Sequence, residues 1–97
     1  MPTYVLLLHW TEQGIKNYKD SVGRLADFTR LAESVGGSVR ETLYTVGEYD
    51  LVTITDFPDD ESATAAVLQA ASLGNVRTTT MRAFTADEMR GIISRIG

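Results

Sequence analysis

The chain has 97 residues, of which 43% are hydrophobic and 23% charged, with only two prolines. This composition predicts one globular domain over residues 1–97 and excludes a disordered or fibrous chain. The formal net charge of −4 and a pI near 4.8 argue against nucleic acid or an anionic membrane as a partner. The absence of cysteine excludes disulfides and thiolate chemistry.

The first third of the chain predicts a strand followed by an interrupted helix. Thr3–Trp10 is rich in bulky and β-branched residues without clean alternation, as expected for a strand covered on both faces. Its apolar run is far too short to span a membrane, so we expect a cytoplasmic protein. Thr11 can cap a helix, and Asp20–Gly23 predicts a break before the main helix, which ends at Gly36-Gly37. Leu25, Phe28, Ala32 and Val35 form its apolar face, and Arg24, Asp27, Arg30 and Glu33 are expected on other faces.

The remainder predicts a hairpin, a helix, a fourth strand and a C-terminal helix. Residues 38–46 and 51–57 have strand chemistry on either side of a Gly-containing turn. Proline and acidic residues at 58–61 indicate a helix start, and the small-residue stripe that follows ends at Gly74. Residues 76–84 predict the last strand. Thr85 and Glu88 have the spacing of a capping box, which places a final helix after it.

This order, βαββαβ plus a C-terminal helix, predicts an α+β ferredoxin-like sandwich with two helices on one face of an antiparallel sheet. Strand 3–10 carries apolar side chains on both faces, and two helices cover only one of them. We therefore expect a second copy of the chain to cover the other face, giving a homodimer or a higher oligomer of dimers.

Two segments carry a family resemblance: Thr45-Val-Gly-Glu-Tyr-Asp-Leu-Val-Thr-Ile54 and Leu73-Gly-Asn-Val-Arg-Thr-Thr-Thr-Met-Arg-Ala-Phe84. With the opening strand, they resemble the GYD domain family, named after the residues seen here as Gly47, Tyr49 and Asp50. The resemblance implies a dimeric α/β barrel and no established reaction. The hairpin is also similar to the ligand-sensing domain of the Lrp/AsnC regulators, although this chain lacks their helix-turn-helix domain.

The hairpin supplies the first candidate site residues. Gly47 suits a position with positive φ, and Asp50 can accept hydrogen bonds from turn amides, so turn structure alone explains both residues. In the functional alternative, the Tyr49 hydroxyl and the Asp50 carboxylate line a ligand cleft at the sheet edge or between subunits.

Other candidates lie at the strand ends. His9 is the one histidine and the candidate acid–base catalyst, while a local structural hydrogen bond is the alternative. Strand parity puts Trp10, a candidate ligand contact, on the opposite face from His9. Asn75 and Arg77 are candidates for holding a carboxylate. Alternatively, Arg77 and Arg82, which parity also places on opposite faces, pair with acidic residues such as Asp50 or Asp56.

Three functional hypotheses remain open. The first is a homo-oligomer that binds a small organic ligand between sheet and helices or between subunits. The second is a cofactor-independent monooxygenase or isomerase, by analogy with other dimeric α/β barrels. The third is a structural assembly protein without a ligand. The sequence contains no phosphate-binding loop, metal-ligand cluster or nucleophile elbow, so we expect no cofactor and no metal.

Overall fold

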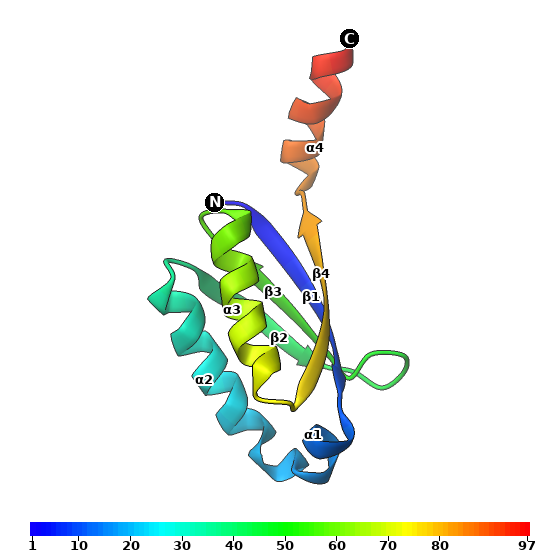
Figure 1. The fold of residues 1–97 in the computed structure, drawn as a ribbon. Coiled ribbons are helices and arrows are strands. Elements are labelled where there is room, and N and C mark those ends of the chain that lie inside the picture. Colours follow the sequence, from blue (N-terminus) through cyan, green and yellow to red (C-terminus); the bar gives the residue numbers. More distant parts are fainter.

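A four-stranded antiparallel sheet is the frame of the domain in the computed structural model, which describes residues 1–97 (Figure 1). The strands are β1 (Thr3–Trp10), β2 (Ser38–Tyr44), β3 (Leu51–Asp56) and β4 (Val76–Ala83). Their order in the sheet is β2-β3-β1-β4, so that β1 lies between β3 and β4. The register places Leu6 opposite Thr53 on one side and Thr80 on the other. This topology confirms the predicted α+β ferredoxin-like fold.

Helices α2 (Ser21–Ser34) and α3 (Asp60–Ser72) lie side by side over one face of this sheet (Figure 1). α3 begins as predicted, because the Asp59 side chain accepts a hydrogen bond from the Ser62 amide at 2.7 Å. Its small residues Ala63 and Ala66 are buried, which allows α3 to lie close to the sheet. The sheet and the two helices therefore form the two layers of the domain.

The segment before α2 differs from the prediction. A short helix, α1 (Glu12–Lys16), is capped by Thr11 as expected, and a 3₁₀ turn at Tyr18–Asp20 follows it. The break thus falls at 17–20, and Gly23 lies inside α2. A side chain at Gly23 would meet nothing within 4 Å, so this glycine sits on an open helix surface that tolerates its weak helix propensity.

The core lies between the sheet and the two helices. Phe57 and Ala32 are fully buried, and Leu6 is 1% exposed. Tyr4 packs edge-on against Phe57, with ring centroids 6.0 Å apart, and its hydroxyl donates a hydrogen bond to Asp60 at the start of α3. Burial, followed by that hydrogen bond, raises the pKa of Tyr4 to about 12.

The C-terminal helix α4 (Ala86–Ile93) continues from β4 away from the sheet and the other helices (Figure 1). The predicted capping box is present: the Thr85 hydroxyl accepts from the Glu88 amide at 3.1 Å, and the Glu88 carboxylate accepts from the Thr85 amide at 2.8 Å. The second of these bonds lowers the pKa of Glu88. The apolar side chains of α4 and of the 3₁₀ turn after it (Ser94–Ile96) are exposed: Met89, Ile92, Ile93 and Ile96. No helix of the chain has the length and apolar character required to cross a membrane.

Candidate functional site

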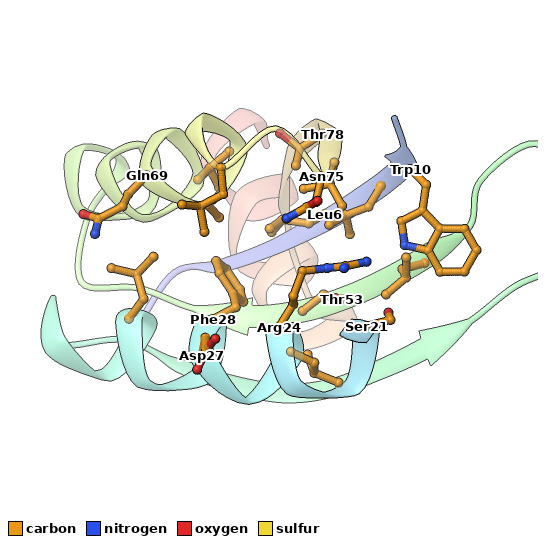
Figure 2. A pocket seen from close by; sticks show the side chains of 18 residues that line it. Leu6, Trp10, Ser21, Arg24, Asp27, Phe28, Thr53, Gln69, Asn75 and Thr78 are labelled. Carbon is orange, nitrogen blue, oxygen red and sulfur yellow. The ribbon is translucent and has the colours of Figure 1, made fainter. Parts of the chain in front are cut away.

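A cavity of about 230 Å³ lies between the sheet and helices α2 and α3 (Figure 2). Eleven of its 18 lining residues are hydrophobic. Those eleven are Leu6, Leu8, Trp10, Leu25, Phe28, Leu31, Leu51, Val67, Ala70, Leu73 and Val76. The cavity therefore extends the hydrophobic core toward the end of β1 that carries Trp10.

Small side chains in the cavity wall help to explain the space. α3 contributes Ala70, and the sheet contributes Thr53 and Thr78 where larger apolar residues would fill more volume. The Thr53 hydroxyl is hydrogen-bonded to the Thr42 hydroxyl at 3.1 Å, so this buried polar group is satisfied within the sheet. The lining near it is therefore largely apolar.

The polar part of the lining includes Arg24, which the helical pattern had placed away from the apolar face of α2. Arg24 lines the cavity, and Figure 2 shows its side chain reaching from α2 into it. The expectation that Arg24 faces away from the apolar side was therefore wrong. Helical spacing carried the signal, because Arg24 lies four residues before Phe28 and three after Ser21, both of which also line the cavity. Asp27 also lines the cavity, and its exposed carboxylate pairs with Arg30.

Two of the candidate residues, Trp10 and Asn75, line this cavity at the same end (Figure 2). The Trp10 ring lies 6.4 Å from the ring of Tyr44, whose hydroxyl is hydrogen-bonded to the Ser21 hydroxyl at 3.0 Å. The Asn75 side chain accepts a hydrogen bond from Gln13 at 3.0 Å. The backbone carbonyl oxygen of Asn75 would lie 2.0 Å from a Cβ at Gly14, so only glycine allows this close approach of α1.

His9, Tyr49 and Arg77 lie on the opposite side of the sheet from the cavity. His9 is paired with Arg77 across β1 and β4, and its ring packs on the Tyr49 ring with centroids 4.7 Å apart. The His9 ring makes no side-chain hydrogen bond. Because Arg77 faces away from Asn75, the two do not form a carboxylate cradle within one copy of the chain.

Asp50 connects the hairpin to β1. Its carboxylate accepts a hydrogen bond from the Trp10 amide at 2.8 Å, and its own amide donates to the Leu8 carbonyl at 2.9 Å. Gly47, with φ of 150°, provides the positive φ expected in the turn. Asp50 thereby fixes the backbone at Trp10, next to the cavity, while its side chain is occupied by an amide.

The two β4 arginines lie on opposite faces, as parity predicted, but they do not pair with the predicted acids. Asp56 is bound instead by Arg40 at 2.5 Å and by the Thr3 hydroxyl at 2.9 Å. Arg40 reaches it because a bulge between Val39 and Glu41 shifts the register of β2. The Arg40 guanidinium is the main cause that lowers the pKa of Asp56. No group of three or more histidine and acidic residues comes together as a metal site.

Comparisons with known proteins agree with this architecture. The chain is 27% identical over 90 residues to a Thermus thermophilus protein named glutamine synthetase and cystathionine beta-lyase binding protein, covering 92% of this chain and 95% of that one. A solved structure from the same organism is 27% identical with a TM-score of 0.56, covering 89% and 96% of the two chains. A feast or famine regulatory protein from M. tuberculosis, solved with L-methionine, shares the fold at 13% identity and a TM-score of 0.67, covering 89% of this chain and 52% of that one.

The family resemblance seen in the hairpin and in β4 extends over nearly the whole chain. The model of the GYD domain matches residues 4–93, from the second residue of β1 to the last residue of α4. The cavity, the hairpin and the capped C-terminal helix all lie inside that match. The chain belongs to the GYD domain family.

Proposed function

We propose that this protein is a homo-oligomeric binding protein for a small organic molecule, held in the cavity between the sheet and helices α2 and α3. The single observation that carries the proposal is the cavity itself, with a volume of about 230 Å³ and a mainly apolar lining. An apolar protein cavity of ~150 Å³ is large enough to bind benzene. A molecule of roughly nine non-hydrogen atoms is the size class that follows.

The arrangement of the polar residues favours binding over catalysis. His9 and Tyr49 lie across the sheet from the cavity, so an acid–base reaction there would have no histidine to use. A few polar groups at one end of a largely apolar pocket are typical of sites that orient a ligand. In this chain Arg24, Asn75 and Ser21 are such groups, and the other polar lining residues are Asp27, Thr53, Gln69 and Thr78.

Self-association is the second part of the proposal. The sheet face opposite the helices has an apolar centre that no segment of the same chain covers: Val5, Leu7, Leu43, Val52, Ile54 and Met81. A second copy stacked on this face would bury those side chains. The dimer leaves the cavity free, because the cavity lies on the other side of the sheet.

Trp10 provides the readout for the binding test, because it is the one tryptophan of the chain and lines the cavity. We would screen small organic molecules by Trp10 fluorescence and thermal shift, and compare the wild type with Ala70→Leu, which fills the cavity. Ala65→Leu on the exposed side of α3 is the matched control. Ligands should stabilise the wild type and Ala65→Leu but not Ala70→Leu. Equal binding to all three proteins would contradict the cavity as the site.

A second candidate function is the binding of an enzyme, as the name of the Thermus relative states for that protein. The exposed apolar face of α4 favours it, because this helix packs against neither the sheet nor α2 and α3. Co-sedimentation with purified glutamine synthetase from the organism that encodes this chain tests it, with Ile93→Glu as the variant that should lose the interaction. Absence of co-sedimentation with the wild-type protein would contradict this function.

A further inference from the structure

Arg24 is the one basic residue among the 18 that line the cavity. It is half-buried in the first part of α2, and Figure 2 shows its guanidinium within the space bounded by the sheet and the helices. Desolvating a charged guanidinium is costly unless it has partners. The hydrogen-bond partners of Arg24 therefore decide whether its charge is satisfied within the protein.

Two backbone carbonyls hold the Arg24 guanidinium in place. One Nη atom donates to the carbonyl of Asn17, just after α1, at 3.0 Å, and the other to the carbonyl of Gly14, within α1, at 3.3 Å. No carboxylate of the chain forms an ion pair with it, since Asp27 pairs with Arg30 instead. The charge is thus oriented by neutral groups and not neutralised, and its remaining N–H donors have no partner in the protein.

A planar guanidinium with unused donors next to an apolar wall matches one ligand chemistry well. Carboxylates bind arginine through paired, charge-assisted hydrogen bonds, and the rest of the molecule can then occupy the apolar space. Phe28 and Val67 lie along that space from the two helices, and Leu6 lies beneath it on β1. A cationic ligand would meet the Arg24 charge and be disfavoured.

We propose that the cavity ligand is a small monocarboxylic acid, with its carboxylate on Arg24 and its apolar chain between the sheet and the helices. This inference rests on the proposed function and adds the chemical class of the ligand. The protein as a whole carries a net charge of −4, so the preference for an anion arises locally at Arg24. Discrimination between charged and neutral forms of one molecule is therefore the property to measure.

The test compares three probes of equal chain length: hexanoate, hexanamide and hexylammonium. Titrations followed by Trp10 fluorescence at neutral pH should show hexanoate binding at least about tenfold more tightly than hexanamide. Hexylammonium should bind more weakly than hexanamide. Added salt should reduce the preference for hexanoate, because it screens the charge on Arg24.

Variants assign that preference to Arg24. In Arg24→Gln the affinity for hexanoate should fall to that for hexanamide, while Lys19→Gln should behave as the wild type, because Lys19 is exposed, lies outside the cavity lining and forms no ion pair. Arg24→Lys, which keeps the charge, should retain part of the preference and also covers the case in which Arg24→Gln does not fold. If wild-type protein binds hexanoate and hexanamide equally, the carboxylate assignment is overturned while the cavity remains a binding site. The proposed function itself fails if the screen of small organic molecules finds no ligand that binds the wild type and loses binding in Ala70→Leu.

Discussion

The two faces of the sheet differ in what covers them more than in how apolar they are. β3 shows this most clearly, because its residues alternate between buried and half-buried. Toward the helices it presents Thr53 and Thr55, which are 3% and 0% exposed. Toward the open face it presents the more hydrophobic Val52 and Ile54, which are only half-buried. The open face is therefore composed like an interior surface.

The two faces also differ in where their polar residues lie. On the covered face, buried threonines are satisfied within the sheet, as where the Thr55 hydroxyl donates to the Tyr4 carbonyl at 2.9 Å. On the open face, polar and charged groups lie toward the margins, with Arg40 and Asp56 paired near one end and His9 beside Arg77 near the other. An apolar centre with a polar rim is the usual anatomy of a protein interface.

Leu6→Ala should have the largest effect on folding. Leu6 is 1% exposed on the covered face, so its truncation should lower the free energy of unfolding by ~2–5 kcal/mol. Leu7→Ala, the neighbouring residue on the open face, should cost less in dilute protein, with a loss that grows at concentrations where copies associate. Denaturant titrations at several protein concentrations provide the measurement. If Leu6→Ala and Leu7→Ala lowered the free energy of unfolding equally at every protein concentration, the two faces would not differ as proposed.

Ile54→Glu should break the proposed dimer without unfolding the chain. A carboxylate in the centre of the open face would be desolvated by a second copy, which should raise the dissociation constant at least ~100-fold. Sedimentation at successive dilutions measures this shift. Ala65→Glu adds the same charge to an exposed position of α3 and should leave assembly unchanged. A wild-type protein that remains a stable monomer at micromolar concentration would contradict the dimer.

Local sequence signals predicted the elements well. The Thr85 and Glu88 capping box, the Asp59 start of α3 and the positive φ of Gly47 each depend on residues close in sequence. The ion pairs predicted for Arg77 and Arg82 were wrong, because such pairs depend on tertiary contacts. Asp56 meets Arg40 only because a bulge in β2 shifts the register, and such a bulge leaves no clear mark in the local pattern.

The candidate site was harder to predict than the fold. Strand parity correctly separated His9 from Trp10, but it cannot say which face the helices cover. Consequently, the candidates included residues from both sides of the sheet. Arg24 was missed because a charged residue on an amphipathic helix is ordinarily assigned to solvent, whereas its place between Ser21 and Phe28 turns it inward.

Tyr4→Phe should alter the alkaline stability of the covered face. The folded-state pKa of Tyr4 is about 12, against an ordinary value of 10.0, so the folded chain retains a proton that the unfolded chain releases. The resulting stabilisation is fully present below pH ~10 and is lost as the pH rises toward ~12. The slope in that window should approach ~1 kcal/mol per pH unit for the wild type and be smaller for Tyr4→Phe. Denaturant titrations across this pH range measure the slope. Tyr49→Phe on the open face is the control, and it should lose stability with pH as the wild type does. Parallel profiles for Tyr4→Phe and wild type would contradict the assignment.

Thr85→Ala should have the smallest effect on global stability, because α4 lies outside both layers of the domain. Removing the cap should cost ~1 kcal/mol within the helix, and Glu88→Ala should cost less because only the reciprocal bond is lost. Since α4 packs on neither the sheet nor the other helices, this cost should remain local in the isolated chain. Amide hydrogen exchange should therefore show reduced protection at 86–89 while the midpoint of thermal unfolding stays unchanged. If Thr85→Ala also lowers that midpoint in a concentration-dependent way, α4 contributes to an interface between copies. A fall in the midpoint that is independent of concentration would instead show that α4 packs against its own domain.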